Sequence, residues 1–339
     1  MSSVSSRILV TGATGMVGAR ICLELLQQGK QVRGFRRENS SNDILKRTFN
    51  GQEHLLSLIE WHTGDVTDVL SVKEAMARIN EVYHCAAIVS FDDRLKKEIE
   101  QINVTGTTNV VNMALETGVS KLCHISSVAA VGRDGNNPEI NESISWKSSK
   151  HNTWYAVTKY AAEREVWRGI EEGLHAVIVN PSIILGPGNW NSGSGLLFRA
   201  VHEGLKFYPT GTTGFVDVSD VANCCISLMN KSITNERFIL NSENIPYQSL
   251  FEFISDSMKR PAPSIKVSPL MSALAWRFEK LRSVLTGSYP KLTKETANTS
   301  MHKWHYDNSK IIDAIGCHFI PVKDSCHQWA EEFERSFGS

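Results

Sequence analysis

Tyr155 and Lys159 stand four residues apart in Tyr155-Ala156-Val157-Thr158-Lys159, a spacing that places both side chains on one face of a helix. A phenol ionises near pH 10, so acting as a base near pH 7 requires its pKa to fall by about 3 units, or about 4 kcal/mol. An ammonium group about 4 Å away contributes about that much at an effective dielectric constant near 20. The pair therefore suits proton transfer to or from a hydroxyl group, although many helices carry such a pair on a solvated surface.

Two serines, Ser126 and Ser127, end an apolar run that begins at Lys121. In open parallel sheets, ligands bind at the carboxyl ends of the strands. A hydroxyl there can hold a substrate oxygen and stabilise the charge that develops on it. The alternative is that a serine ends the strand for its turn-forming chemistry.

Thr11 to Gly18 reads Thr-Gly-Ala-Thr-Gly-Met-Val-Gly, directly after the apolar run 8–10 and directly before a helical pattern that stops at Gly29. A strand, a glycine turn and a helix N-terminus in that order form a cradle for phosphate. The first glycine permits a tight turn, the second lets the backbone approach a pyrophosphate and the third lets the helix pack on the strand. Glycine turns also occur without a ligand, but this position and register favour a dinucleotide site.

The elements that must position these residues alternate along the first half of the chain. We predict strands at residues 8–10, 31–35, 58–62, 81–85, 121–126 and 175–179, with long helices at 101–117 and 153–172. This alternation predicts an α/β Rossmann fold, a doubly wound parallel sheet covered on both faces. Residues 1–180 are expected to form the dinucleotide-binding domain.

The pattern changes after Pro181, where turn-rich stretches alternate with helices near 196–203, 218–230 and 249–259. Short apolar runs at 237–240 and 265–267 are candidates to extend a sheet. We therefore expect residues 181–339 to form a smaller C-terminal α/β substrate lobe, interleaved with the last Rossmann elements.

The glycine spacing TGxxGxxG, the strand-ending serine and the YxxxK pair together resemble the extended short-chain dehydrogenase/reductase family, part of the NAD-dependent epimerase/dehydratase superfamily. The resemblance implies that Ser127 is the catalytic serine, Tyr155 the proton donor and acceptor, and Lys159 its partner. It also implies that Asn103 holds a proton-relay water. Without the family, Asn103, Asp65 and Ala86 are equally well interpreted as capping or packing residues. The resemblance implies cofactor contacts at Thr11, Gly12, Thr14, Gly15, Met16, Val17, Gly18, Asp65, Val66, Ala86, Ala87, Tyr155, Lys159, Pro181, Ile183 and Ile184.

Charge indicates which dinucleotide is bound. NAD-specific sites usually offer a carboxylate to the ribose 2′-hydroxyl, about 20 residues beyond the glycines. Aligned on Gly29 and Val32, Arg36 takes that place here and Arg37 follows it. Two guanidinium groups suit a 2′-phosphate, so we predict NADP, with NAD as the alternative. The competing interpretations are a solvated basic turn, and an NAD site using Glu38, which lies one residue too late.

Composition excludes several classes of function. The 36 basic and 36 acidic residues cancel, so no global charge directs the protein to nucleic acid or an anionic membrane. Seven cysteines without CxxC spacing fit reduced thiols in a cytoplasm, and they give no metal site. The lead from Met1 to Ser6 does not resemble a signal peptide, and no apolar run is long enough to span a membrane. The expectation is a cytoplasmic enzyme that forms a homodimer.

The sequence of the substrate lobe indicates which branch of the family the chain resembles most. Sugar-nucleotide members typically carry a G-D-G-x-x-x-R element, whose arginine grips the diphosphate, whereas residues 211–222 are shorter here and lack that arginine. The tail, residues 292–321, resembles dihydroflavonol-4-reductase-like and 3β-hydroxysteroid dehydrogenase-like members. Candidate residues for an apolar substrate wall, each of which also suits the lobe's own core, are Trp190, Leu197, Phe198 and Tyr208, with Val89 and Ser127 as further substrate contacts.

The apolar stretch Leu270–Leu285 allows three interpretations: a lid over a pocket, a core helix, or a face resting on a membrane. We favour core or lid, because Arg277, Glu279 and Lys280 mix both signs of charge.

These observations predict an NADP(H)-dependent oxidoreductase that interconverts a carbonyl and a secondary alcohol on a small, partly apolar substrate. One alternative is an NAD(P)-dependent sugar-nucleotide epimerase or dehydratase. A second is a non-catalytic NADP sensor or scaffold, which would not need the serine and the phenol.

Overall fold

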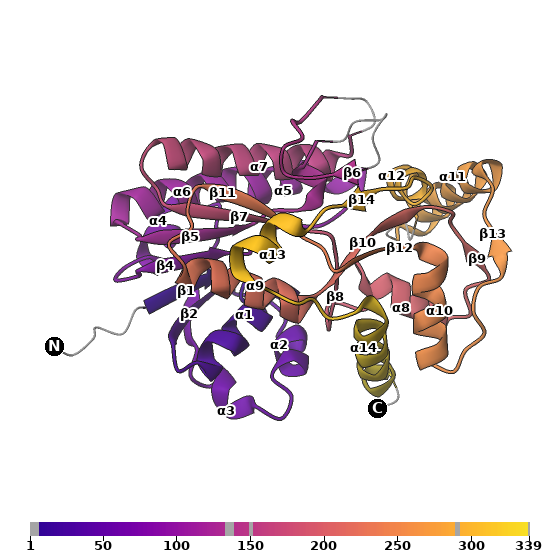
Figure 1. Cartoon of the computed structure of the whole chain (residues 1–339), viewed down its shortest axis with the longest axis horizontal. Helices are drawn as coiled ribbons and strands as arrows, with labels where there is room; N and C mark the ends of the chain where they lie inside the picture. The colour runs from indigo at the N-terminus through magenta and orange to yellow at the C-terminus, as the bar shows by residue number, and fades with distance from the viewer. Residues whose placement is uncertain (1–6, 133–138, 149–151, 289–291, 338–339) are drawn as a thin grey trace.

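A seven-stranded parallel sheet forms the centre of the computed structural model, which describes residues 7–132, 139–148, 152–288 and 292–337 (Figure 1). Met1–Ser6, the predicted N-terminal lead, lies outside the described residues. The strand order is β11-β7-β5-β4-β1-β2-β3, so the chain builds outward from β1 in both directions. The strands are β1 (Arg7–Thr11), β2 (Gln31–Arg36), β3 (Glu60–Thr63), β4 (Glu81–His84), β5 (Lys121–Ile125), β7 (Ala176–Pro181) and β11 (Glu236–Leu240).

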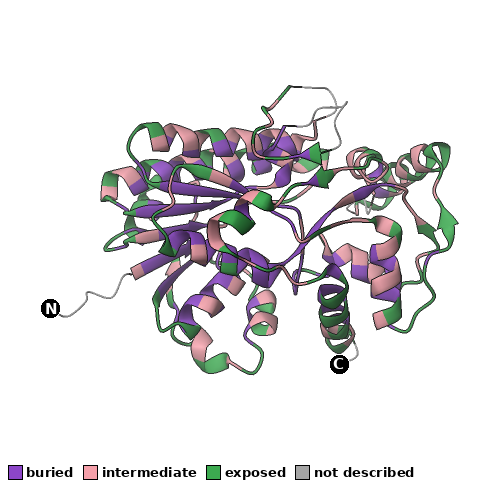
Figure 2. Ribbon diagram, in the orientation of Figure 1, coloured by how far each residue is buried: buried purple, intermediate pink, exposed green. Residues whose placement is uncertain are grey.

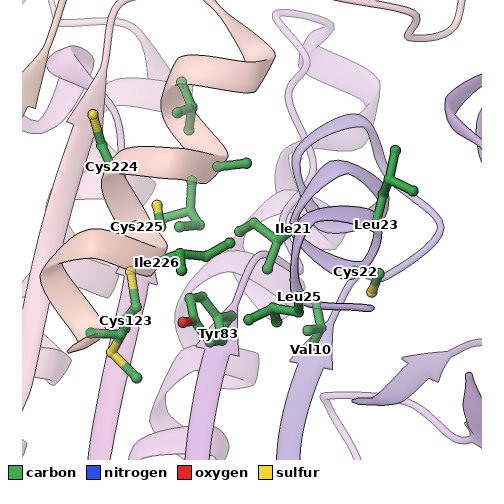
Figure 3. Packing of buried hydrophobic residues seen from close by; sticks show 14 of the residues in the cluster. Val10, Ile21, Cys22, Leu23, Leu25, Tyr83, Cys123, Cys224, Cys225 and Ile226 are labelled. Carbon is green, nitrogen blue, oxygen red and sulfur yellow. The ribbon is translucent and has the colours of Figure 1, made fainter. Parts of the chain in front are cut away.

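Helices cover both faces of this sheet, because its strands are apolar on both sides. On one face, α1 (Met16–Gln27) and α9 (Val218–Asn230) pack together over Val10 and Tyr83, as Figure 3 shows. On the other, α4 (Val69–Ala75), α6 (Gly106–Thr117) and α7 (Trp154–Glu171) enclose a second apolar cluster. The predicted doubly wound Rossmann fold is confirmed.

The glycine turn after β1 depends on two close approaches. Gly12 has a φ of +63°, and a Cβ there would lie 2.8 Å from the backbone nitrogen of Ala86. A Cβ on Gly18 would lie 2.3 Å from the carbonyl oxygen of Gly12. The chain therefore needs glycine at both positions to bring the first turn of α1 against the ends of β1 and β4.

The second half of the chain forms a smaller lobe beside the carboxyl ends of the sheet (Figure 1). Its three-stranded sheet has the order β12-β10-β8, and its core lies between α8, α10 and α14. The elements are β8 (Ile183–Leu185), α8 (Gly195–His202), β9 (Phe207–Tyr208), β10 (Thr212–Asp217), β12 (Glu243–Pro246), α10 (Tyr247–Ser257), β13 (Ile265–Lys266), α11 (Pro269–Thr286), α12 (Lys294–Thr299) and α14 (Val322–Phe337).

The two halves are interleaved. Although α9 and β11 follow residue 181, α9 packs on α1 and β11 pairs with β7 in the main sheet. The run at 265–267 instead forms β13, which pairs with β9 away from the main sheet. The main sheet therefore continues past residue 181. The predicted division of the chain into a cofactor-binding and a substrate-binding part at residues 180 and 181 stays a prediction.

Several short elements were not predicted. They are α2 (Asp43–Thr48), α3 (Glu53–Leu56), a 3-10 turn (Asp93–Leu95) that leads into α5 (Lys96–Glu100), a second 3-10 turn (Val128–Ala130), α13 (Ser309–Ile315), and the pair of β6 (Glu139–Ile140) with β14 (His305–Tyr306). The helix predicted at 101–117 begins with a π-helical turn at Gln101–Thr105 before α6 starts. Such turns frequently mark functional sites.

α11 corrects one expectation. The stretch 270–285 is a helix, but Ser283 is its one buried residue, and Phe278 is 71% exposed. The interpretation as a core helix is therefore wrong. Figure 2 shows this helix at the far edge of the small lobe, mostly coloured as exposed or intermediate.

Candidate active site

A cavity of about 690 Å³ opens where the strands of the main sheet end. The glycine turn supplies one wall, the segment after β3 a second, and the segment after β4 a third. From the small lobe, the loop 189–191 and the end of α14 close the remaining side. The predicted cofactor residues that line it are Gly12, Thr14, Gly15, Arg36, Arg37, Asp65, Val66, Ala86 and Ala87.

The first turn of α1 suits an anionic group. Gly15 occupies the N-cap position, and among the described residues no side chain caps this helix end. The backbone N–H groups in the first turn of α1 are therefore available to a ligand in the cavity. The dipole of the helix also favours negative charge at this end. These features fit the pyrophosphate of a dinucleotide.

Thr11 is almost fully buried and holds the ends of β1 and β4 together. Its Oγ1 lies 2.8 Å from Nδ1 of His84 and accepts hydrogen bonds from the backbone N–H groups of Cys85 and Ala86. Burial lowers the pKa of His84 to about 3, so its ring is neutral. One tautomer satisfies the whole network, with Thr11 donating to Nδ1 and Nε2–H donating to Thr107. Thr11 thus shapes the cradle from behind.

Arg36 and Arg37 line the cavity together with Ser40 and Ser41, at the end of β2. The Arg36 guanidinium lies 4.4 Å from the centroid of the Trp61 ring, and its Nη1 donates to Asn42. Stacking and hydrogen bonding hold this guanidinium at the rim. Glu38 is not among the residues that line the cavity.

Asp65 is held in a tight turn as it reaches the cavity. Its Oδ1 accepts from both the backbone N–H and the hydroxyl of Thr67. Val66 is buried beside Gly106, where a Cβ would lie 2.8 Å from a Val66 methyl group. This contact lets the start of α6 pack directly behind the wall of the cavity that Val66 lines.

The predicted catalytic residues meet at the carboxyl end of β5, beside the continuation of β4 that lines the cavity. α7 begins at its N-cap Thr153 and turns Tyr155 and Lys159 inward, where both are buried. Ser127 lies close enough to the Tyr155 hydroxyl to lower the pKa of that phenol. Lys159 donates through Nζ to the carbonyl of Ile125, 2.8 Å away.

The pKa values correct one step of the sequence argument. Burial raises the pKa of Tyr155 to about 12, and the hydrogen bond with Ser127 only partly opposes this. Burial also lowers the pKa of Lys159 to about 8, against the field of Glu163, which raises it. The expected lowering of the phenol's pKa by Lys159 is therefore not found here, because desolvation dominates both groups. Tyr155 is protonated at neutral pH, as a proton donor must be.

Ser127 is fixed by two backbone interactions. Its Oγ accepts from the N–H of Ala129, and its carbonyl accepts from the side chain of Asn180, at 3.1 and 2.9 Å. The serine that ends β5 is thus positioned on both sides, and its hydroxyl is still able to donate.

Asn103 lies in the π-helical turn and is buried. Its Oδ1 accepts from the backbone N–H of Ile88 at 2.7 Å, and its Nδ2 donates to the carbonyl of the same residue at 3.0 Å. The side chain therefore fixes the segment after β4, which lines the cavity. The proton-relay role implied by the family stays a prediction.

Glu163 is a site residue that the sequence analysis missed. It is 1% exposed, and its carboxylate accepts from Ser126, Asn180 and Arg237. It stands four residues beyond Lys159, just as Lys159 stands four beyond Tyr155, so all three share one helix face. That repeated spacing was the available signal. Glu163 thus acts on Lys159 through its charge and on Ser126, at the end of β5, through a hydrogen bond.

Arg47 was also missed, because nothing in the sequence around it marks a ligand. It lines the cavity from α2, donates to the carbonyl of Gly188 at 3.0 Å and approaches the ring of Trp190. It therefore connects the Rossmann half to the small lobe across the rim.

The remaining predicted cofactor residues support the walls and do not line the cavity. Met16 packs against Gly186 and Gly188, where a Cβ on Gly186 would lie 2.8 Å from the Met16 sulfur. Val17 and Gly18 pack α1 onto its neighbours. At the ends of β7 and β8 lie Pro181, which is buried, and Ile183 and Ile184, which are half-buried.

The residues predicted to form an apolar substrate wall fall into two groups, those that line the cavity and those that do not. Phe198 is fully buried against Trp190, and both belong to the small lobe's core with Phe333. Trp190 also lines the cavity, whereas Phe198 does not. Leu197 and Tyr208 are half-buried against the same core. Phe198 is therefore placed as a packing residue in this structure. Val89 is 56% exposed, near the active site.

The fold and these side chains define a nucleotide-dependent enzyme of the Rossmann class. A profile of the NAD dependent epimerase/dehydratase family matches residues 8–240. The chain belongs to this family and is an enzyme of it.

Individual proteins agree with this assignment. The chain is 31% identical to the "Putative dihydroflavonol 4-reductase" of Synechocystis sp. over 327 residues, which cover 93% of this chain and 91% of the relative. It resembles the crystal structure of gox2253 with a TM-score of 0.81 and 27% identity, over 98% and 99% of the two chains. The UDP-glucose 4-epimerase of Thermotoga maritima, at 17% identity and a TM-score of 0.77 over 98% and 99%, shows the shared fold.

Proposed function

We propose that the protein is an NADP(H)-dependent oxidoreductase that interconverts a ketone or aldehyde and the corresponding alcohol. The observation that carries this proposal is the meeting of Ser127, Tyr155 and Lys159 beside a dinucleotide-sized cavity. A protein that only sensed the cofactor would not need a buried phenol with its proton in place. The similarity to a relative named as a reductase supports the same reaction class.

The residues divide the work as follows. Bound cofactor would supply the hydride. Ser127 would hold the carbonyl oxygen of the substrate, and Tyr155 would deliver the proton to that oxygen as charge develops on it. Lys159, on the same helix face as Tyr155, would hold the ribose.

Two features support NADP over NAD as the cofactor. Arg36 and Arg37 both line the cavity where the adenosine ribose would lie, and Glu38 does not. We expect NADPH to bind at least about tenfold more tightly than NADH, a difference of about 1.4 kcal/mol. Arg37→Ala should remove most of that difference, and Glu38→Gln should leave it unchanged. Equal affinities in the unmutated protein would contradict the proposal.

For the substrate we propose a small, partly apolar carbonyl compound. Phe91 packs edge-on against Tyr155, with ring centroids 5.6 Å apart, and Val89 is exposed close by. β10 lacks the arginine with which sugar-nucleotide enzymes of this family hold a diphosphate. These features give the approach to Tyr155 an apolar character, and β10 offers it no cationic clamp.

A screen of NADPH oxidation with aryl and alicyclic ketones, aldehydes and nucleotide sugars tests this proposal. We expect turnover of the ketones and neither binding nor turnover of UDP- or GDP-sugars. Micromolar binding of a nucleotide sugar to the NADP-loaded protein, measured by calorimetry, would instead favour an epimerase or dehydratase. The fold that the chain shares with such enzymes makes this the competing candidate.

We further propose that the protein works as a homodimer in the cytoplasm. All seven cysteines are unpaired in the structure, which suits a reducing compartment. Light scattering of the purified protein tests the dimer directly.

A further inference from the structure

α11 has its polarity reversed relative to an ordinary surface helix. The side chains that turn toward the protein are mostly polar: Ser272, Glu279 and Arg282 are half-buried and Ser283 is buried. Ala273 and Trp276 are half-buried beside them. The side chains that turn outward are large and apolar, and they recur every three or four residues, which places them on one face. Their exposed fractions are 70% for Leu270, 60% for Leu274, 71% for Phe278, 57% for Leu281 and 76% for Leu285.

An exposed face of this kind requires a partner. Five large apolar side chains in one stripe exceed the scattered exposure that is normal on a protein surface. The apolar surface continues off the helix, because Ile265 of β13 is 42% exposed and Phe207, on the paired strand β9, is 44% exposed. The patch lies at one end of the small lobe, away from the main sheet (Figure 1).

Charge identifies the partner. The chain as a whole is neutral, but between Asp256 and Glu295 it carries eight basic residues and one acidic residue. That single acid, Glu279, turns inward and pairs with Arg282 at 2.6 Å, so the mixture of signs seen in the sequence does not persist on the outer surface. The basic residues are Lys259, Arg260, Lys266, Arg277, Lys280, Arg282, Lys291 and Lys294.

We propose that α11 docks the enzyme on an anionic lipid surface, lying in the plane of the headgroups with Leu274 and Phe278 inserted. An apolar helix face with basic residues beside it is the arrangement that binds such surfaces, since the long basic side chains reach the phosphates while the apolar face is buried. No helix among the described residues is long and apolar enough to cross a membrane. α11 thus rests on the bilayer without spanning it.

Sedimentation of the full chain with lipid vesicles tests the proposal. We expect binding to vesicles of phosphatidylcholine with about one third phosphatidylserine, weakened by salt, and little binding to phosphatidylcholine alone. The double variant Leu274→Ser/Phe278→Ser should lower the vesicle partition coefficient at least about tenfold. Leu70→Ser is the matched control, because Leu70 is 69% exposed on α4, outside the patch. It should bind like the unmutated protein.

A second double variant isolates the contribution of charge. Arg277→Gln/Lys280→Gln keeps the apolar face and should lower the preference for anionic vesicles by about fivefold per residue. The proposal is overturned if the unmutated protein does not bind anionic vesicles, or if the serine variant binds equally well. It is also overturned if light scattering shows that Leu274→Ser/Phe278→Ser lowers the oligomeric state of the unmutated protein, because the stripe would then join two copies of the chain. Vesicle binding is measured without a substrate, so its result does not depend on whether the proposed activity is correct.

Discussion

α7 and α11 are both helices of 18 residues, and both turn polar side chains toward the protein. In α7 these are Tyr155, Lys159 and Glu163, all three buried. Lys159 donates to the carbonyl of Ile125, and Glu163 accepts from Ser126. In α11 the inward groups include two serines and one acid, and the stripe of four leucines and Phe278 is outside. Buried polar groups are costly unless partnered, so α7 shows an inward face specialised for chemistry. α11 shows an outward face specialised for contact.

The largest effect should come from removing the phenol of α7. Tyr155→Phe is expected to lower turnover at least about 100-fold, because Tyr155 is the group proposed to deliver the proton. NADPH affinity, measured by fluorescence titration, should stay nearly unchanged. Full turnover of the variant on an identified substrate would show that the inward polar face of α7 is structural, as that of α11 is.

Glu163→Gln should change the pH dependence. Burial brings the pKa of Lys159 to about 8, and Glu163 raises it, so removing that charge moves the pKa further down. Lys159 is charged below its pKa, and activity that needs the charge is lost as pH rises through it. We expect the alkaline limb of kcat/KM to move to lower pH by roughly one unit, equivalent to about 1.4 kcal/mol.

A matched control is available on the same helix. Glu165 pairs with Arg168 and lies on another face of α7. Glu165→Gln should leave the alkaline limb in place. An unchanged profile for Glu163→Gln would mean that this carboxylate only braces Ser126 and Asn180.

The smallest effect should come from α11. Phe278→Ser should change the free energy of unfolding by less than about 0.5 kcal/mol, because the side chain is 71% exposed. On α7, by contrast, Val166→Ala should cost about 2 kcal/mol, since Val166 is fully buried. Urea denaturation followed by circular dichroism measures both. A large loss for Phe278→Ser would show that the stripe already packs against part of this chain.

The comparison also shows what sequence can predict. The sheet, the glycine turn and the convergence of Ser127 with Tyr155 follow from local patterns, because strand order and helix periodicity place them. The position of Arg47 at the site could not be predicted, since it depends on a contact with Gly188, 141 residues away in the sequence. The pKa of Tyr155 was mispredicted because spacing reports the distance to Lys159 but not the extent of burial. Likewise, the pattern in α11 defined an apolar face but not its direction.

The return of the chain to the main sheet has a consequence for folding. β11 pairs with β7 along five residues. In the chain, β11 follows β8, β9 and β10 of the small lobe, so these three strands are synthesised before it. A fragment ending at residue 180 would leave β7 as an open edge, with unpaired backbone groups ready to join another chain. It would also leave Ile21 and Leu25 of α1 without the cover of α9. During synthesis, the nucleotide-binding half is therefore exposed to aggregation until at least residue 240 has left the ribosome.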